Sequence, residues 1–180
     1  MPRNLRAPNP GLSAALAYCE HGWSVIPLEP RGKRPLIKWE RYQFERPTNA
    51  DARQWWRKEP NANVGIVTGR INRLVVLDVD PAKGGDQALT DLEHEHGALP
   101  KTVSVRTGGG GQHFYFQHPG VPIPNCAGKL GPGLDVRGEG GYVVAPPSIH
   151  LSGKPYEWGA TAFRRRGPCT PSALVARASE

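Results

Sequence analysis

Two aspartates at the end of an apolar, β-branched run, residues 74–80, are the first candidates for chemistry. The run predicts a buried strand, and side chains two positions apart on a strand point to one face, roughly 6.5–7 Å apart. Asp78 and Asp80 should therefore face one side together. Two like charges this close are unfavourable unless a cation, a proton or strong donors lie between them, so the pair indicates a divalent metal. The alternative is that Asp80 is only a turn residue before Pro81.

A glycine-rich stretch, residues 107–113, is the second candidate. Its four glycines exceed what a tight hairpin needs, and without Cβ atoms they leave backbone N–H groups open to a bulky anion. His113 begins the expected strand 113–117 and lies on the opposite face from Phe114 and Phe116. If both phenylalanines are in the core, His113 faces the open side. A histidine at a strand start can be purely structural, but its position behind the glycines favours a functional role.

A third stretch, residues 131–148, contains a short expected strand in which apolar residues alternate with Asp135 and Arg137. An acid and a base then project from one face. By themselves they could be a solvated pair of neighbours. Together with Asp78 and Asp80, however, Asp135 supplies a third carboxylate, and three acids around hard cations match the Mg²⁺ or Mn²⁺ sites of phosphoryl and nucleotidyl transfer.

The N-terminal elements that would support these stretches begin with a helix. Asn9 reads as its cap and Pro10 as its first residue, and apolar residues recur at helical spacing until Gly22. A strand over residues 23–28 should follow, and Pro27 within it favours the edge of a sheet or the end of the strand.

A second helix should begin at Thr48, which with Asp51 resembles a capping box. This helix carries Trp55 and Trp56, one of which is expected in the core. Paired aromatics in a basic chain could instead stack on bases. Residues 63–67 then form a short expected strand.

Beyond Asp80 the pattern is helical, with an apolar stripe that ends at Gly97. The next expected strand covers residues 102–106. The order strand, helix, strand predicts a crossover unit, most easily a right-handed one.

Composition favours a polyanionic partner such as nucleic acid or nucleotide, because 23 Lys and Arg against 16 Asp and Glu give a net charge of +7. One turn is crowded with cations. It could grip phosphates or be an ordinary solvated loop; its basic residues are Arg31, Lys33, Arg34 and Lys38.

The three cysteines, Cys19, Cys126 and Cys169, are odd in number and form no CxxC pair. The sequence therefore indicates neither a disulfide framework nor a zinc site, and a reducing cytoplasm fits. No apolar stretch approaches the ~20 residues that span a bilayer, and the N-terminus lacks a signal-peptide core. We expect a cytoplasmic protein without membrane partners.

In this order the motifs resemble the primase-polymerase domain of the archaeo-eukaryotic primase superfamily. The chain is most similar to the bifunctional DNA primase/polymerase N-terminal domains of plasmids, phages and integrated elements. The resemblance covers roughly residues 10–160. It rests on the hydrophobic-DxD run at 77–80, on GGQH at 110–113, on Leu134-Asp135 followed by RGEGGYVVAPPS at 137–148, and on the early segments 32–39 and 63–69.

The resemblance implies an α/β (α+β) fold with two lobes, a catalytic module of RNA-recognition-motif type beside an N-terminal α/β unit. Asp78, Asp80 and Asp135 would bind two Mg²⁺ or Mn²⁺ ions, so the open faces of their strands must converge. His113 would contact the triphosphate of the incoming nucleotide. Further nucleotide contacts would come from Thr107, Gly110, Gly111, Arg137, Ser148 and His150, and nucleic-acid contacts from Lys33, Arg34 and Lys38.

The implied activity is template-dependent nucleotidyl transfer from a dNTP or NTP to a 3′-OH, with pyrophosphate released. Single-stranded DNA template and primer would be partners, with a helicase domain or protein as a further one; no zinc is expected. Relatives often continue into a helicase, and no Walker-type phosphate loop is present here, so the chain is either a piece of a longer protein or works alone. We expect residues 1–9 to be disordered, 10–162 to form the catalytic domain, and 163–180 to form a basic tail or short helix.

Two alternatives remain at this point. One is a non-catalytic domain that binds single-stranded nucleic acid through basic loops and Trp55 or Trp56. The other is a phosphatase of the haloacid dehalogenase type, with Asp78 as nucleophile and Asp80 as acid/base. The sequence departs from that phosphatase pattern at Ala82.

Overall fold

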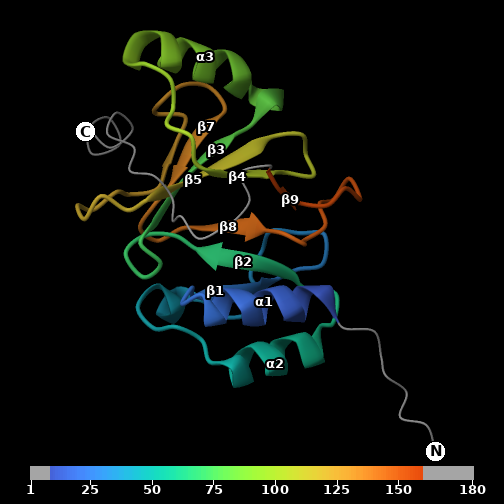
Figure 1. Cartoon of the computed structure of the whole chain (residues 1–180). Coiled ribbons are helices and arrows are strands. Elements are labelled where there is room, and N and C mark those ends of the chain that lie inside the picture. The colour runs from blue at the N-terminus through green and yellow to red at the C-terminus, as the bar shows by residue number, and fades with distance from the viewer. Residues whose placement is uncertain (1–8, 160–180) are drawn as a thin grey trace, which may run out of the picture.

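A computed structural model describes residues 9–159 of the chain as an α+β fold of three α-helices and two antiparallel sheets. In Figure 1 the layers run from α3 at the top, through the larger and then the smaller sheet, to α1 and α2 at the bottom. The predicted basic tail or helix at 163–180 lies outside the described residues, as does the predicted disordered segment except for Asn9, which belongs to the cap of α1.

The larger sheet has six strands in the order β6-β7-β3-β5-β4-β9, and all neighbours are antiparallel. The apolar run that carries the aspartates lies in the interior of this sheet as β3. The strands are β3 (Leu74–Val79), β4 (Val103–Arg106), β5 (Gln112–Gln117), β6 (Cys126–Ala127), β7 (Leu134–Arg137) and β9 (Glu157–Trp158).

Helix α3 (Gly85–His96) connects β3 to β4, as the strand-helix-strand pattern predicts. β3 and β4 are parallel to each other, because each pairs antiparallel with β5, which lies between them. This arrangement is a split βαβ unit, the beginning of a ferredoxin-like β-α-β-β order. The segment between β5 and β7 contains the short strand β6 and no helix.

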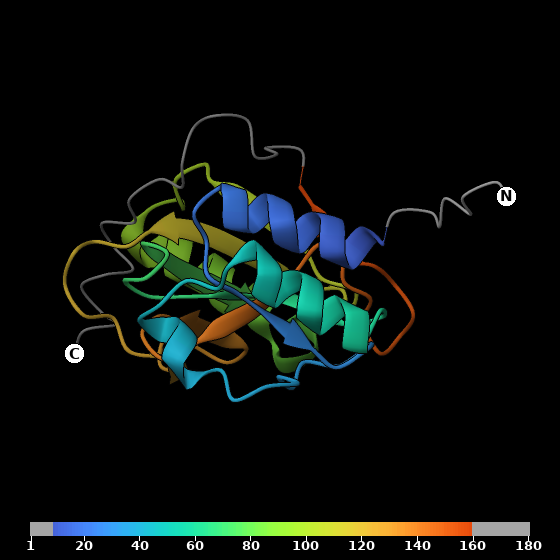
Figure 2. The same ribbon diagram turned by 90° about the horizontal axis from the view of Figure 1, so that it is seen from below.

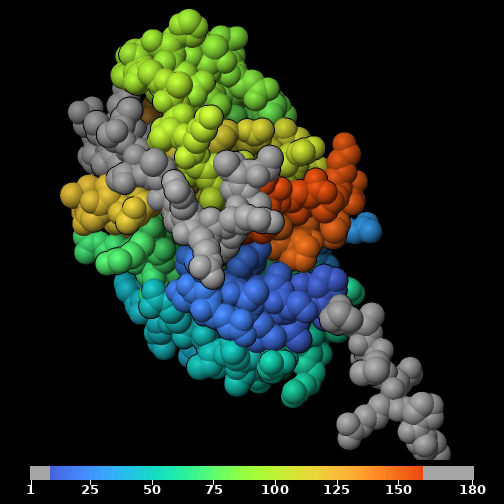
Figure 3. Space-filling view, in the orientation of Figure 1, coloured from blue at the N-terminus to red at the C-terminus, as the bar shows by residue number. Residues whose placement is uncertain are grey.

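The smaller sheet has the order β1-β2-β8, from β1 (Val25–Leu28), β2 (Asn63–Val67) and β8 (Tyr142–Ala145). Pro27 is therefore on an edge strand, as predicted. Helices α1 (Pro10–Glu20) and α2 (Asn49–Lys58) pack against this sheet, and Figure 2 shows both on its outer side. The space-filling view shows them as one continuous layer at the bottom of the molecule (Figure 3).

Both predicted helix starts are confirmed by their capping hydrogen bonds. The Asn9 side chain accepts a hydrogen bond of 3.0 Å from the Leu12 N–H. Thr48 and Asp51 form the complete capping box, in which the Asp51 carboxylate accepts from the Thr48 N–H at 2.8 Å and the Thr48 hydroxyl accepts from the Asp51 N–H at 3.1 Å. These caps fix the residues at which α1 and α2 begin.

Two hydrophobic cores lie on the two faces of the larger sheet. One contains α3 with every second residue of β3, including Leu77. The other joins the larger sheet to the smaller one and contains Leu74 and Val76. Because side chains alternate along a strand, Asp78 continues the series of Leu74 and Val76. It therefore faces the smaller unit, which consists of the smaller sheet, helices α1 and α2, and their loops.

The two tryptophans of α2 contribute to this arrangement in different ways. Trp56 is buried in the core, as predicted for one of the pair, and Trp55 packs edge-on against Tyr42, which belongs to the 3₁₀ helix η1 (Glu40–Gln43). Among residues 9–159, no helix combines the length and apolar character needed to cross a bilayer.

Candidate active site

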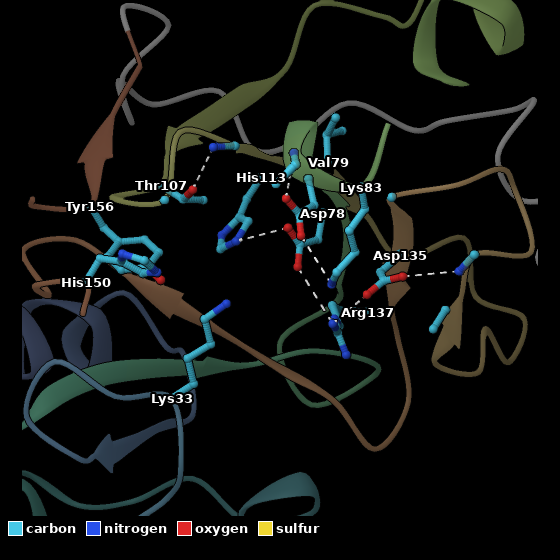
Figure 4. Close-up of a pocket in the computed structure, with 17 residues that line it drawn as sticks. Lys33, Asp78, Val79, Lys83, Thr107, His113, Asp135, Arg137, His150 and Tyr156 are labelled. Atoms are coloured by element: carbon cyan, nitrogen blue, oxygen red, sulfur yellow. Dashed lines mark hydrogen bonds and ion pairs between the residues drawn. The ribbon is translucent and has the colours of Figure 1, made fainter. Parts of the chain in front are cut away.

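A cleft of about 550 Å³ lies between the open part of the larger sheet and the loops of the smaller unit. It is the place where the predicted site residues gather. Figure 4 shows the acids of β3 and β7 on one wall, with Lys33 and His150 on the other. Of the predicted residues, the cleft is lined by Lys33, Asp78, Asp80, Thr107, Gly111, His113, Asp135, Arg137 and His150.

Asp78 and Asp135 are direct cross-strand partners in the register of β3 and β7. Like charges placed opposite each other destabilise a sheet, and here Arg137 compensates them. Its Nη2 atom lies 2.9 Å from Asp135 Oδ2 and 3.7 Å from Asp78 Oδ2. The sequence correctly predicts an acid and a base on one face of β7. The structure adds that Arg137 forms ion pairs with both Asp135 and Asp78.

Asp80 lies just beyond the end of β3, where it is the turn residue that the sequence offered as an alternative, and it also borders the cleft. As a turn residue it caps the short 3₁₀ helix η2 (Pro81–Lys83), because its Oδ1 accepts from the Ala82 N–H at 3.1 Å. It also lines the cleft with Asp78. Its other oxygen, Oδ2, is 3.2 Å from the ammonium group of Lys83.

His113 is opposite Asp78 on β5, and its Nε2 atom is 3.5 Å from Asp78 Oδ1. The expected face is correct and borders the cleft, but His113 is not open to solvent, because Tyr115 and Tyr156 pack beside it and it is only 5% exposed. Burial lowers the pKa of His113 to about 4, although Asp78 opposes the shift. The imidazole is thus neutral near pH 7. Its Nδ1 atom has no hydrogen-bond partner among residues 9–159.

The glycine loop requires a correction. The N–H groups of Gly110 and Gly111 are not free for an anion, because they donate to the carbonyl and the hydroxyl of Thr107 at 3.0 Å each. A Cβ on Gly111 would lie 2.3 Å from the Val79 carbonyl oxygen, and one on Gly108 2.3 Å from the His150 Cβ. The glycines therefore allow the loop to pack against the protein. Gly110 does not line the cleft, whereas Thr107 does.

His150 presents a defined donor to the cleft. Its Nδ1 atom accepts from the Ser152 N–H at 3.1 Å, so in the neutral ring the proton is on Nε2. The Ser152 hydroxyl also donates to the Gly108 carbonyl oxygen at 2.8 Å. This bond ties the loop of His150 to the glycine loop and fixes their relative position.

Three predicted contacts lie elsewhere. Ser148 is buried, and its hydroxyl accepts from the Val64 N–H at 2.8 Å. It therefore joins two parts of the smaller unit and does not reach the cleft. Arg34 is outside the cleft, with its Nε donating to Glu29 at 2.9 Å, and Lys38 is also absent from the lining. Of the basic turn, only Lys33 lines the cleft.

The acids fit a divalent cation in chemistry and in location, since Mg²⁺ and Mn²⁺ prefer carboxylate oxygens and all three aspartates line one cleft. Within residues 9–159, however, no group of three or more His, Cys, Asp or Glu side chains is placed to hold a metal ion. The carboxylates are turned instead to Arg137 and Lys83. Metal binding at this cleft would require them to rotate away from these cations.

Among the titratable side chains that line the cleft, sequence reasoning missed two. Lys83 follows Asp80 by three positions, a spacing that a single helical turn brings together, and this signal was available in the sequence. Tyr156 belongs to an irregular segment and carries no such signal. Burial raises its pKa to about 12.

The fold and the site define an α+β domain whose cleft has paired carboxylates on one wall and Lys33 and His150 on the other. The chain belongs to the family described as bifunctional DNA primase/polymerase, N-terminal, whose sequence model matches residues 15–173 and so includes every residue named in the cleft. Membership indicates a function of the primase/polymerase kind and an enzyme of the nucleotidyltransferase type. No curated protein matches this chain.

Proposed function

We propose that this protein is a template-dependent DNA primase/polymerase that uses Mg²⁺ or Mn²⁺ and acts in the replication of a plasmid, phage or mobile element. The observation that carries the proposal is the in-register pair Asp78 and Asp135, whose carboxylates face a cleft with Lys33 and His150 on the opposite wall. Single-stranded DNA, a primer and dNTPs or NTPs are the proposed ligands, and a helicase is the proposed partner.

The size and charge of the cleft support nucleotide binding. Pockets for small ligands typically enclose about 300–1,000 Å³, and this cleft has about 550 Å³. Lys33 and the Nε2–H of His150 suit the negative charge of a triphosphate, and the acids on the other wall would repel it. A nucleotide would therefore bind with its phosphates toward Lys33, His150 and Thr107.

In the proposed reaction, a hydroxyl oxygen attacks the α-phosphorus of the bound nucleotide. A new P–O bond forms as the bond to the oxygen that bridges the α- and β-phosphates breaks, the hydroxyl passes its proton to water, and pyrophosphate leaves. Asp78, Asp80 and Asp135 would hold the divalent ions, which when bound lower the pKa of the hydroxyl and neutralise charge on the phosphates. Lys33 and His150 would stabilise the leaving pyrophosphate by hydrogen bonds.

For His113 we propose contact with the triphosphate through its single N–H, which would leave Asp78 to make that contact. The neutral ring can donate one hydrogen bond, and its Nε2 atom is already oriented toward Asp78 at 3.5 Å. Arg137 could contact phosphate once it is released from the acids.

A primer-synthesis assay with Mg²⁺ or Mn²⁺, labelled dNTPs and NTPs and a single-stranded template tests the proposal. The double variant Asp78→Ala, Asp80→Ala should lose nucleotide incorporation while its circular dichroism spectrum stays unchanged. Asp91→Ala, on the outer side of α3, is the matched control and should keep full activity. Retained synthesis in the double variant would refute the assignment.

The alternatives receive less support. In the non-catalytic reading Trp55 and Trp56 would bind bases, yet Trp56 is buried and Trp55 packs on Tyr42, on a helix outside the smaller sheet (Figure 1). Binding of single-stranded DNA without any incorporation would favour that reading. The family match leaves the dehalogenase-type phosphatase without support.

A further inference from the structure

Lys83 lies beside the proposed metal ligands, although no strand positions it. The three-residue helix η2 begins directly after Asp80 and returns the lysine to that carboxylate, with Nζ 3.2 Å from Oδ2. In Figure 4 its side chain points toward the acids of β3 and β7. The group of three aspartates is thus compensated by two cations, Lys83 at Asp80 and Arg137 at the other two.

These two cations are held with different strength. Arg137 is on a strand, its side chain is 36% exposed, and it contacts both Asp78 and Asp135. The side chain of Lys83 is 71% exposed and makes a single ion pair. Pairs this exposed contribute little to stability, and a lysine has a flexible stem with a compact ammonium group. Lys83 is therefore the cation that can leave its carboxylate most easily.

An ammonium group and a divalent cation compete for the same oxygens of Asp80. Where the divalent cation binds, Lys83 loses its acceptor and is repelled by the added charge. Lys83 itself lines the cleft, so a triphosphate bound there is the nearest new group of anionic oxygens. Phosphate oxygens accept hydrogen bonds from lysine readily.

We propose that Lys83 is a phosphate-binding residue. It forms an ion pair with Asp80 while no metal is bound, and it leaves this carboxylate for the incoming triphosphate when the metal binds. The inference rests on the proposed function and deepens it, because it names a residue that couples metal binding to nucleotide binding. Its signature is that removing the ammonium group affects the two ligands in opposite directions.

Isothermal titration calorimetry on the full chain tests this signature, first with MnCl₂ alone and then with dATP at saturating Mn²⁺. For Lys83→Met we expect Mn²⁺ to bind roughly three- to ten-fold more tightly and dATP roughly three- to ten-fold more weakly, with both changes shrinking at high salt. Lys83→Arg, which keeps the charge, should stay close to wild type. Lys58→Met, which removes a lysine from the last turn of α2, controls for net charge.

Two results would overturn the inference: an unchanged Mn²⁺ affinity in Lys83→Met, or affinities for both ligands that move in the same direction. The calorimetry also separates this failure from failure of the proposed function. If Asp78→Ala, Asp80→Ala binds Mn²⁺ as wild type does, the metal site itself is refuted. If that double variant loses Mn²⁺ while Lys83→Met behaves as wild type, only the role of Lys83 is refuted.

Discussion

Asp78 and Asp135 stand on neighbouring strands whose register fixes the distance between them, whereas Lys33 and His150 stand in loops on the opposite wall of the cleft. The acidic wall inherits its geometry from a ladder of backbone hydrogen bonds shared by β3, β5 and β7. The opposite wall, formed by the loops of Lys33 and His150 and called the loop wall below, depends on a few side-chain hydrogen bonds. We infer that the wall built on strands is preorganised for chemistry, whereas the loop wall adjusts its position to the ligand.

One buried side chain, that of Asn63, bonds to both loops of the loop wall. The Asn63 amide nitrogen donates to the carbonyl oxygens of Gly32 at 3.0 Å and Ile149 at 2.8 Å, and its Oδ1 accepts from the Ile149 N–H at 2.9 Å. Gly32 and Ile149 immediately precede Lys33 and His150. A single residue of β2 thus bonds to both of the loops that carry Lys33 and His150.

Breaking the acidic wall should have the largest effect. Asp135→Asn keeps the shape of the side chain but removes one of the two facing charges, so incorporation should fall by about 10²–10³-fold. The melting temperature should not fall, because the repulsion between neighbouring acids is also removed. Primer extension measures incorporation, and thermal unfolding measures the melting temperature. A large loss of stability would mean that Asp135 is a structural residue.

Loosening the loop wall should have a smaller effect, on nucleotide binding more than on the chemical step. Asn63→Ala leaves buried backbone groups without partners, which should cost about 1–3 kcal/mol of unfolding free energy. Because both loops loosen, the KM for nucleotide should rise about tenfold while kcat changes less. Steady-state kinetics at saturating template measure KM and kcat separately. A fall in kcat with an unchanged KM would contradict the division between the walls.

The smallest effect sharpens the comparison within one loop. Lys33→Met should weaken nucleotide binding by about three- to five-fold, as expected for one partly solvated phosphate contact. Arg34→Met, at the next residue but paired with Glu29 outside the cleft, should leave it unchanged. Equal effects of the two substitutions on dNTP affinity would show that the loop acts only through its net charge.

The same difference explains what the sequence could predict. Alternation along a strand is a local rule, and it correctly assigned Asp135 and Arg137 to one face of β7. The loops obey no such rule. Hydrogen bonds to Thr107 occupy the amides of Gly110 and Gly111, and these bonds have no pattern in the sequence.

Two further errors have a common physical cause, which is packing between distant segments. His113 is buried where Tyr156 from a distant segment packs beside it, and periodicity within one strand does not report what covers it. Ser148 was predicted to bind phosphate from its place in a motif, but its hydroxyl bonds to Val64, 84 residues away in the sequence. Lys83 was overlooked although its spacing from Asp80 was visible.

The order of strands in the smaller sheet constrains how the chain can be made and divided. Its third strand, β8, is synthesised long after β2, and the whole of β3 to β7 lies between them in the sequence. During translation, the edge of β2 that β8 will occupy stays unpaired until residues 142–145 leave the ribosome. Exposed strand edges promote aggregation. A fragment that ends before β8 should therefore be insoluble, and this domain must be expressed through β8 to fold.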